Sequence, residues 1–418
     1  MLVFKFGGAS VKDASGMVNL ANVVKKYEHD QLLIVVSAMG KTTNALEKLT
    51  KAYFNRDENI YEIFEDIKQY HYGILNELFE SADTVFDEVE NTFVEIDWII
   101  EDEPHDDYDF IYDQIVSIGE LVSTRIVAAY LNKTGLKSRW LDVRGYVHTD
   151  NTYREGLVQW DKTKASINRD IPGILENSIV VTQGFLGGTS ENFTTTLGRE
   201  GSDYTASIFA ACLGAESVTT WKDVPGILNA DPKFFADTIK FDELSYSEAI
   251  EMTYYGASVI HPKTIKPLQN AKIPLLVKPF ADPNAPGTVI KEHSNSIFIK
   301  PIIILKQNQV LLSLSAKDYS FISENHLSGI FGLFAQNHVK VNTMQISALS
   351  FTVCIDFYED RFKKLLQDLG QHFRVKYNEG LTLITVRHYS PASLKELTAG
   401  KTILLEQVSR NTVQMVIK

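Results

Sequence analysis

Short apolar runs alternate with longer stretches of helical spacing over the first 290 residues of this 418-residue chain. Residues 2–6 and 31–37 are nearly continuous apolar runs, and residues 11–26 between them repeat apolar positions at helical spacing. This order predicts a βαβ unit in a parallel sheet that is covered on both faces. The pattern continues in three further apolar runs, at residues 178–184, 217–227 and 273–278. The first part of the chain is therefore predicted to be an α/β domain.

The composition shifts to proline, asparagine and glycine over residues 281–296, which predicts a boundary between two domains, 1–290 and 300–418. Beyond it the elements are short and follow the order βαββαβ of a ferredoxin-like unit, at about residues 308–380. They are strand 310–315, helix 327–337, strand 339–347, strand 351–357, helix 361–371 and strand 373–377. Residues 381–417 look like a second, truncated copy, which lacks one helix and one strand unless residues 302–305 supply the strand.

Composition narrows the choice of function classes. A hydrophobic content of 44% and a charged content of 22% are typical of a globular protein, and the net charge of −12 disfavours nucleic acid as a partner. Cys212 and Cys354 lie among apolar residues and are predicted to be buried thiols. The first residues form no charged-then-apolar leader, and Lys300 and Pro301 interrupt the apolar run 297–305. We therefore expect a cytoplasmic protein without a membrane segment.

Two glycines directly follow the first apolar run. Gly7 and Gly8 would let the backbone approach a ligand closely, and the helix predicted to begin after Ser10 would direct free N–H groups to the same place. Lys5, inside the apolar run, would reach toward a phosphate held there. The alternative is a plain tight turn, with Lys5 facing solvent.

A second polar stretch, residues 194–206, runs from a glycine-punctuated loop into an apolar helix. The loop would gather backbone N–H groups, hydroxyls, the guanidinium of Arg199 and the carboxylate of Asp203, a mixture that suits a phosphorylated or carboxylated ligand with a metal. The alternative is an ordinary helix start with Ser202 or Asp203 as the N-cap. No metal ligand is assigned elsewhere, because the acidic stretch 101–107 is predicted to be a solvated loop.

Glu120 lies in the mostly apolar stretch 117–124, where a carboxylate needs a partner because burying an unpaired charge is costly. It could pair with Arg125 or bind the ammonium group of a ligand. Ser37 and Thr43 follow the second apolar run. The carboxyl ends of parallel strands are where open α/β sheets bind ligands, so these two hydroxyls are candidate binding groups.

Six motifs occur in order along the chain, and together they resemble those of one family. They are Lys5-Phe6-Gly7-Gly8, Thr43-Asn44, Gly119-Glu120, Gly198-Arg199 with Gly201-Ser202-Asp203-Tyr204-Thr205-Ala206, Trp221-Lys222-Asp223-Val224-Pro225-Gly226, and residues 256–262. On these motifs the chain resembles the aspartokinases, which belong to the amino-acid kinase superfamily and carry a C-terminal ACT regulatory region. The resemblance implies a carbamate-kinase-like αβα sandwich, followed by α+β ferredoxin-like ACT units.

The resemblance also implies an activity, the transfer of the γ-phosphoryl group of ATP, with Mg²⁺, to the side-chain carboxylate of L-aspartate. The product would be 4-phospho-L-aspartate, made in the first step of lysine, threonine and methionine biosynthesis. The implied catalytic residues are Lys5 and Asp203. The residues implied in aspartate binding are Ser37, Thr43, Glu120 for the ammonium group and Arg199 for the α-carboxylate. The residues implied in nucleotide binding are Lys5, Gly7, Gly8, Ser10, Trp221, Lys222, Asp223, Pro225, Gly226 and Lys233.

Five positions depart from the family pattern. Ala9, Glu200, Leu228 and Ser258 stand where Thr, Gly, Tyr and Lys are usual, and these changes are expected to affect nucleotide affinity rather than catalysis. Asn342 stands where lysine-sensitive members have an aspartate. A lysine or threonine effector would suit an ACT region, but we expect inhibition by lysine to be weak or absent.

The edges of ferredoxin-like sheets favour pairing between chains, so a homodimer is expected. Two alternative functions remain open at this point. One is a sister kinase that phosphorylates glutamate, carbamate or uridylate. The other is an amino-acid sensor that kept the fold and lost catalysis, although it would be expected to have lost Lys5 or Asp203 as well.

Overall fold

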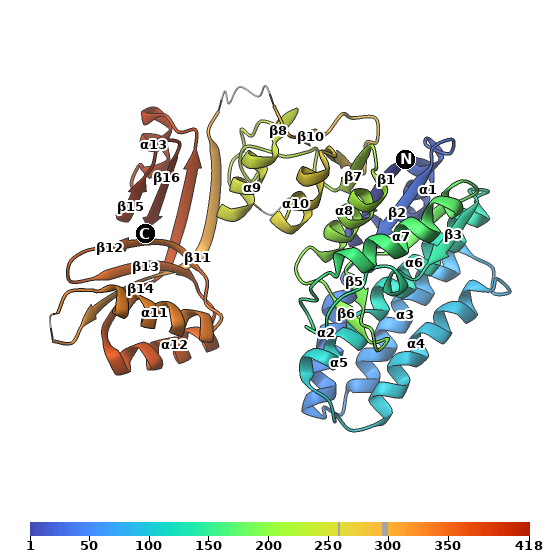
Figure 1. Ribbon diagram of the computed structural model, residues 1–418, viewed down its shortest axis with the longest axis horizontal. Helices are drawn as coiled ribbons and strands as arrows, with labels where there is room; N and C mark the ends of the chain where they lie inside the picture. The colour runs from blue at the N-terminus through green and yellow to red at the C-terminus, as the bar shows by residue number, and fades with distance from the viewer. Residues whose placement is uncertain (258–259, 295–299, 319) are drawn as a thin grey trace. The chain divides into compact units, whose positions relative to one another are not determined.

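The computed structural model describes residues 1–257, 260–294, 300–318 and 320–418 (Figure 1). The chain divides into two compact units. The N-terminal unit comprises Met1–Ile227, Lys240–Ile250 and Ser258–Ser296, and the C-terminal unit comprises Leu228–Ile239, Glu251–Ala257 and Ile297–Lys418. The main division lies close to the predicted boundary. Two short segments from before residue 290 nevertheless group with the C-terminal unit.

An eight-stranded sheet forms the centre of the N-terminal unit, in the order β3-β4-β2-β1-β7-β9-β10-β8. Strand β1 (Leu2–Phe6) pairs in parallel with β2 (Leu32–Val36) on one side and β7 (Ser217–Lys222) on the other. Every residue of β2 is fully buried, as expected for a strand covered on both faces. The remaining strands of the unit are β3 (Ser138–Leu141), β4 (Ile179–Gln183), β8 (Glu243–Ser245), β9 (Leu275–Pro279), β10 (Thr288–Lys291) and the separate hairpin β5 (Leu186–Gly188) and β6 (Thr194–Thr196).

Helices pack against the sheet and against one another, and their apolar spacing is the pattern seen in the sequence (Figure 1). They are α1 (Ala14–Lys25), α2 (Thr42–Asn55), α3 (Ile60–Leu78), α4 (Val85–Glu101), α5 (Tyr108–Val116), α6 (Ile118–Lys133), α7 (Trp160–Leu175), α8 (Gly201–Leu213), α10 (Pro262–Ala271), and α9 (Tyr246–Tyr255), whose second half groups with the C-terminal unit. Helix α1 starts later than predicted. A 3₁₀ turn (Gly8–Val11) comes first, and Asp13 then caps α1 by accepting a hydrogen bond from Gly16 N–H at 2.8 Å.

The stretch Tyr108–Lys133, which contains α5 and α6, is long and apolar enough by composition to cross a membrane, and it is the only such stretch in the part of the chain that the structure describes. In the structure, 78% of its most apolar window is buried inside the N-terminal unit. Burial of this kind is typical of a core helix, which explains an apolar stretch without a membrane.

A six-stranded antiparallel sheet, in the order β12-β13-β11-β14-β16-β15, forms the C-terminal unit. Its elements are β11 (Ile302–Ala316), α11 (Glu324–Gln336), β12 (Val341–Ile346), β13 (Phe351–Asp356), α12 (Glu359–His372), β14 (Phe373–Arg387), α13 (Pro391–Thr398), β15 (Ile403–Val408) and β16 (Thr412–Ile417). The order β12-β13-β11-β14 with α11 and α12 is a ferredoxin-like unit, as predicted. Val310, Ile330 and Leu365 are among the residues of its core.

The second ferredoxin-like copy is less truncated than the sequence suggested. Ile302 to Lys306, the first part of β11, pairs antiparallel with the last part of β14, from Leu383 to Arg387. Residues 302–306 therefore supply the strand that the second copy would otherwise lack. With β15, β16 and α13 it completes a four-stranded copy, which within the described residues is one helix short. The first copy is inserted inside the second, because β11 and β14 each run through both.

Candidate active site

Four charged side chains meet where β1, β7 and the first turn of α8 come together. Lys5 Nζ lies 2.8 Å from one carboxylate oxygen of Asp203, and Lys222 Nζ lies 3.2 Å from the other. Glu200, just before α8, places a carboxylate oxygen 3.9 Å from Lys222 Nζ. Strands β1 and β7 are neighbours in the sheet, so residues 5 and 222, far apart in sequence, reach the same carboxylate. Asp203 is 2% exposed, which makes this a buried ion cluster.

The pKa values of the cluster follow from its geometry. Burial alone would raise the pKa of Asp203, but the ammonium groups of Lys222 and Lys5 hold it well below its usual range. Burial would lower the pKa of Lys222, and the carboxylates of Asp203 and Glu200 raise it instead. Burial raises the pKa of Glu200 despite the attraction of Lys222. Near neutral pH, Asp203 is therefore a carboxylate held between two ammonium groups.

Glu200 occupies a backbone position that favours glycine. Its φ is +58°, in the left-handed region, where a residue with a Cβ is disfavoured. The glycine that the resemblance implies at this position would adopt this backbone conformation without strain. The chain tolerates the strained position and gains a second carboxylate beside Lys222.

The two glycines after β1 lie against the loop that follows β2. A Cβ on Gly8 would lie 2.6 Å from the carbonyl oxygen of Ala38 and 2.9 Å from that of Gly40, so only glycine fits without a shift of backbone. A Cβ on Gly7 would be 3.6 Å from Lys5 Nζ, which places the ammonium group beside the Gly7 backbone. Lys5 is buried next to this turn and does not face solvent, so the plain-turn alternative is wrong.

Glu120 lies in the first turn of α6 and is 3% exposed. One carboxylate oxygen accepts a hydrogen bond from Ala38 N–H at 3.2 Å, and the other has no hydrogen-bond partner among the described residues. Burial raises the pKa of Glu120 to about 8, against the opposing effects of the Ala38 hydrogen bond and of Lys5. A buried carboxylate with one free oxygen can accept a cationic group from a ligand.

The structural alternative for Glu120, a pair with Arg125, is wrong. The Arg125 guanidinium lies 4.0 Å from the centre of the Trp140 ring and 3.5 Å from a carboxylate oxygen of Glu88. Residues 120 and 125 are five apart on α6, so their side chains point to different faces of the helix.

The other predicted aspartate-binding residues, Ser37, Thr43 and Arg199, differ in their burial and in their contacts. Ser37 directly follows β2, next to Ala38, and its carbonyl accepts a hydrogen bond from Ser123 Oγ at 2.8 Å. Thr43 is half-buried in the first turn of α2. Arg199 is exposed in the loop before α8 and forms no ion pair within the described residues. Its guanidinium is therefore available to a ligand.

Asp113 on α5 is a residue that the sequence reasoning missed. Its carboxylate accepts hydrogen bonds from the N–H groups of Arg154 and Thr196, both at 2.8 Å, and from the Thr196 hydroxyl at 2.7 Å. It thus anchors β6, from which the chain enters the loop of Arg199. Burial raises the pKa of Asp113 to about 6, although these hydrogen bonds favour the charged form. The sequence does contain a signal for this residue, because Asp113 places a carboxylate at a position where the apolar spacing of the helix predicts a buried side chain.

The predicted nucleotide-binding residues are not all brought together. The Trp221 ring is fully buried, stacked 6.2 Å from the Phe6 ring, with Lys278 Nζ 5.3 Å from its centre, so the ring cannot line an open pocket. The Ser10 hydroxyl is also buried, and it donates a hydrogen bond to the Trp221 carbonyl at 3.5 Å. Asp223 and Pro225 are exposed after β7.

Two further nucleotide positions, Leu228 and Lys233, belong to the segment Leu228–Ile239, which groups with the C-terminal unit. Lys233 is exposed there, and its backbone N–H bonds the Asp231 carboxylate at 2.9 Å. Gly226, at φ +146°, stays in the N-terminal unit. Ser258 lies outside the described residues. The nucleotide-binding roles of all these residues stay predictions.

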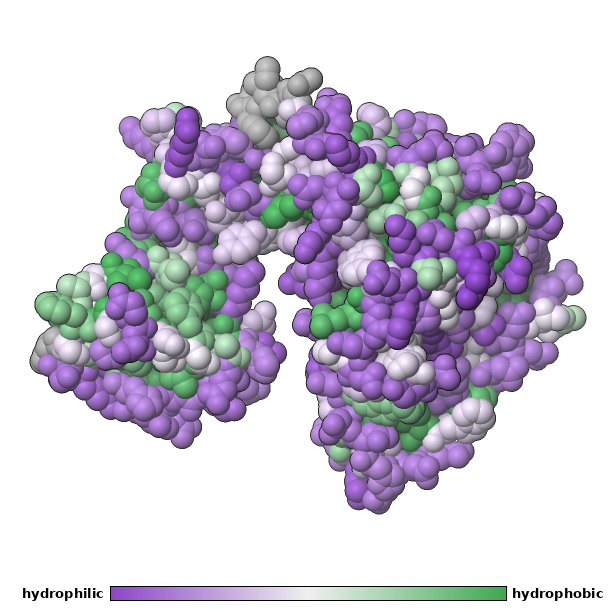
Figure 2. Space-filling model, viewed as in Figure 1, coloured by the Kyte–Doolittle hydropathy of each residue, from purple (hydrophilic) through white to green (hydrophobic). Residues whose placement is uncertain are grey.

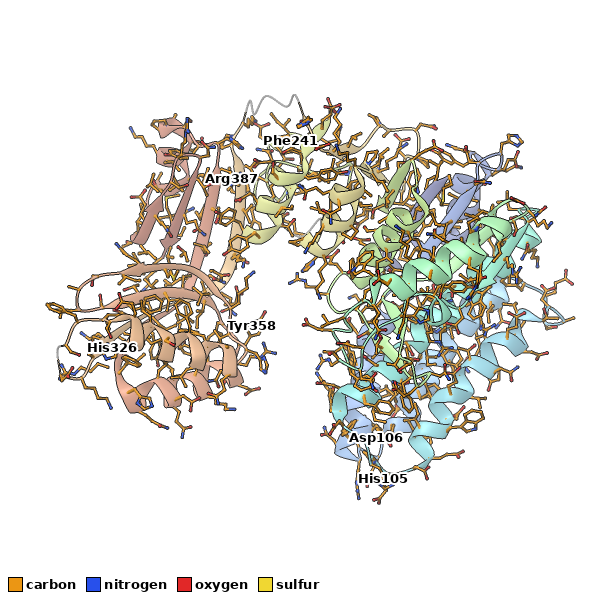
Figure 3. The ribbon with its side chains drawn as sticks, in the orientation of Figure 1. His105, Asp106, Phe241, His326, Tyr358 and Arg387 are labelled. Atoms are coloured by element: carbon orange, nitrogen blue, oxygen red, sulfur yellow. The ribbon has the colours of Figure 1, made fainter. Side chains whose placement is uncertain are left out.

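No group of three His, Cys, Asp or Glu side chains that could hold a metal ion occurs in the described part of the chain. The acidic stretch 101–107 is exposed over most of its length, as predicted for a solvated loop. Figure 3 shows His105 and Asp106 at the tip of this loop, at the far end of α4 from the sheet.

Comparison with known proteins decides the family. The model of the amino acid kinase family matches residues 1–279. Lysine-sensitive aspartokinase 3 of Escherichia coli is 30% identical over 393 residues, which cover 92% of this chain and 86% of that protein. The chain belongs to the aspartokinase family. Another member of the aspartokinase family, the chloroplastic aspartokinase 2 of Arabidopsis thaliana, is 32% identical over 383 residues, covering 88% of this chain and 69% of that protein.

Solved aspartokinase structures share the fold. A crystal structure of E. coli aspartokinase III in complex with aspartate and ADP, in the R-state, matches with a TM-score of 0.86 and 28% identity over 100% of this chain and 96% of that one. The complex of the E. coli protein with lysine and aspartate, in the T-state, matches with a TM-score of 0.84 and 28% identity, covering 100% of this chain and 95% of that one. The predicted fold class, an amino-acid kinase domain followed by ACT-like antiparallel units, is confirmed.

The raised pKa of Glu120 predicts a particular dependence of stability on pH. Between pH 4.5, the ordinary pKa of a glutamate, and about pH 8, the unfolded chain releases the Glu120 proton and the folded chain keeps it, so this residue lowers the free energy of unfolding as pH rises. The loss is at most about 1.4 kcal/mol per pH unit. Glu120→Gln removes this loss of stability, because glutamine does not ionise, and its side-chain oxygen can still accept the hydrogen bond from Ala38 N–H.

We therefore expect Glu120→Gln to be more stable than the parent chain by several kcal/mol at pH 8, with the difference vanishing toward pH 4.5. Urea unfolding from pH 5 to 8, followed by tryptophan fluorescence, measures this difference, since Trp98, Trp140, Trp160 and Trp221 all lie in the N-terminal unit. A stability difference that does not change with pH would contradict the assignment.

Proposed function

We propose that this chain is an aspartate kinase, which transfers the γ-phosphoryl group of ATP to the side-chain carboxylate of L-aspartate. The product is 4-phospho-L-aspartate, formed in the first step of lysine, threonine and methionine biosynthesis. The observation that carries the proposal is the pairing of two buried centres. The free carboxylate oxygen of Glu120 and the Lys5–Asp203–Lys222 cluster both border the turn at Ala38, one suited to an ammonium group and the other to phosphate.

Aspartate has one cationic and two anionic groups, and the predicted residues provide a partner for each. Glu120 would accept the substrate ammonium group, which also offsets the cost of burying its own charge. Arg199 would bind the α-carboxylate as a two-pronged donor, and the hydroxyls of Ser37 and Thr43 would orient the carboxylates. The complex of E. coli aspartokinase III with aspartate and ADP supports this substrate and this nucleotide.

The chemistry requires positioning and charge compensation more than proton transfer. The acceptor carboxylate is already ionised near neutral pH, so it attacks the γ-phosphorus without a general base. The bond from the γ-phosphorus to the bridging oxygen breaks, and ADP leaves with the electron pair. Lys5 and Lys222 would stabilise the charge on the phosphoryl oxygens, while Asp203 holds both ammonium groups in place.

Mg²⁺ is part of the proposal as the companion of ATP, whose phosphate charge it would neutralise. The donor set explains why no side chain is assigned to the ion. Both Asp203 oxygens already face lysine ammonium groups, and Glu200 is the other carboxylate of the cluster. Magnesium commonly keeps several waters and binds phosphate oxygens, which agrees with a site poor in dedicated ligands.

The C-terminal unit is proposed to be an ACT regulatory region with weak or absent response to lysine. Asn342 uses both ends of its amide within the unit: Oδ1 accepts from Lys306 Nζ at 2.7 Å, and Nδ2 donates to Gln309 Oε1 at 2.8 Å and to Asp356 Oδ1 at 3.1 Å. The Asn342 amide carries no net charge and is engaged at both ends, so it does not offer a ligand ammonium group the charge that an aspartate would. Threonine remains the other candidate effector, and a cytoplasmic location remains a prediction.

A homodimer through the C-terminal sheet is also proposed. Strands β12 and β15 are the two edges of this sheet, and each exposes large apolar side chains, including Met344, Ile346, Ile403 and Leu404. Figure 2 shows apolar surface on this unit. Exposed edges with apolar side chains favour pairing with a second chain.

Loss of the Lys5 ammonium group should remove most of the activity. With Mg-ATP, L-aspartate and hydroxylamine, the purified chain is expected to form aspartyl hydroxamate, and Lys5→Met should lower kcat by about 10²–10³-fold. The control is Lys25→Ala, an exposed lysine on α1, which should leave the rate unchanged. Transfer to glutamate, carbamate or uridylate instead of aspartate would indicate a sister kinase, and ATP binding without transfer would indicate a sensor.

Lysine at sub-millimolar concentration is expected to leave the hydroxamate rate unchanged. Asn342→Asp should introduce sensitivity, because the new carboxylate could bind an ammonium group. The rate is measured with rising lysine for both proteins. Half-inhibition of the parent chain below a millimolar would contradict the proposal.

The mass in solution should be twice that of the 47.1 kDa chain. Multi-angle light scattering measures it, and Ile346→Lys, which places a charge on the β12 edge, should shift the mass toward one chain if β12 forms the contact. Glu324→Lys, on the nearby helix α11, serves as the control for added charge. A monomeric parent chain would exclude the dimer.

A further inference from the structure

An open cavity of about 600 Å³ lies in the outer helical layer of the N-terminal unit, between α7 and α10 and above α8. None of its lining residues belongs to the proposed catalytic, aspartate-binding or nucleotide-binding sets. Its nearest approach along the chain is Tyr204, which follows Asp203 on α8. Asp203 faces the sheet and the two lysines, and Tyr204 lines the cavity.

The charge around the cavity is of one sign. Lys164 comes from α7, and Lys263 and Lys266 come from α10, so ammonium groups stand on two walls. None of the three forms an ion pair within the described residues, and no acidic side chain lines the cavity. The whole chain has 53 acidic and 41 basic residues and a net charge of −12, so this local excess of positive charge is contrary to the overall composition. Such an arrangement favours an anionic ligand.

The remaining lining is largely apolar. Leu157 is 64% exposed and Trp160 is 40% exposed, whereas Cys212 and Pro267 are buried and Ala211 is half-buried. A large aromatic and a leucine left open beside a cavity are typical of a binding surface. The volume falls within the range of small-molecule sites, which combine apolar walls with a few polar groups that fix orientation.

We propose that this cavity binds a small organic anion, with a flat apolar body against Trp160 and Leu157 and a carboxylate, sulfonate or phosphate group among the three lysines. The apolar walls supply affinity through burial of the ligand body, and the ammonium groups select an anion over a neutral molecule of the same shape. A nucleic acid is disfavoured as the ligand, because the chain as a whole is strongly acidic and only three lysines line the cavity.

The test uses the full-length chain and the probe 8-anilinonaphthalene-1-sulfonate, an aromatic anion of suitable size. Isothermal titration calorimetry is expected to show one site per chain, with an affinity that falls as salt rises. The double variant Lys263→Glu/Lys266→Glu should weaken binding by about tenfold or more, equivalent to about 1.4 kcal/mol. Ala211→Leu, which adds bulk to the lining and keeps all three lysines, should also weaken binding. Lys162→Glu, an exposed lysine of α7 outside the cavity, is the matched control and should bind like the parent chain.

Circular dichroism of each variant checks that it is folded, and the Ala211→Leu result keeps the test valid if charge reversal disturbs α10. Binding that is unaffected by both the double variant and Ala211→Leu would overturn the proposal. So would equal weakening by Lys162→Glu, since only the general charge would then matter. A change in sedimentation mass for the double variant alone would show that a second copy of the chain covers this face, and would overturn it as well.

Discussion

The site of the N-terminal unit depends on bringing two ammonium groups and two carboxylates together around Asp203, which is buried. Any one of these charges alone would be costly to remove from water, and the cost is met only when the others lie within contact distance. Lys5, Asp203 and Lys222 come from three separate segments, so the cluster forms only if β1 lies beside β7 with the start of α8 across them. The site therefore forms only when the central strands take this order in the sheet.

Glu120 shows the opposite arrangement, in which a buried carboxyl group has too little positive charge nearby to ionise at its ordinary pKa. A single backbone N–H and a more distant Lys5 do not offset its burial, so its pKa is raised to about 8. Replacing such a residue by its amide would favour folding, and keeping the carboxylate makes sense if a ligand supplies the missing positive charge. Stability and recognition therefore make opposing demands on this one side chain.

Much of the fold and of the site could be predicted from the sequence, because the spacing of apolar residues indicates which positions are buried and the motifs indicate the chemistry of the site. Strands, helices, the first ferredoxin-like unit and the importance of Lys5, Asp203 and Glu120 all follow from local patterns. The sequence pattern does not indicate which buried side chains contact one another. The sequence does not indicate that Lys222 also pairs with Asp203, as the structure shows; its nucleotide-binding role stays a prediction. Arg125 was a candidate partner of Glu120, and it lies on Trp140.

Other differences between the prediction and the structure also arise from contacts between residues that are distant in sequence. The sequence predicts the Trp221 ring at a ligand pocket, but the ring is in the core, stacked on Phe6, because β7 is an inner strand of a sheet that is covered on both faces. Asp113 was not singled out, since its partners, the backbone of residues 154 and 196, are distant in sequence. The left-handed backbone at Glu200 likewise depends on the turn that carries it and not on the residue type.

The insertion of one ferredoxin-like copy inside the other has a consequence for synthesis on the ribosome. Residues 302–306 leave the ribosome well before residues 383–387, with which they pair, so this half of β11 must wait while the inserted copy forms. Once the inserted copy has folded, it brings the two distant segments together at the ends of β11 and β14, and little entropy remains to be lost in closing the outer copy. The nested arrangement therefore makes the inner copy a template for the outer one, and the C-terminal unit can acquire its full sheet only after its last strands have been translated.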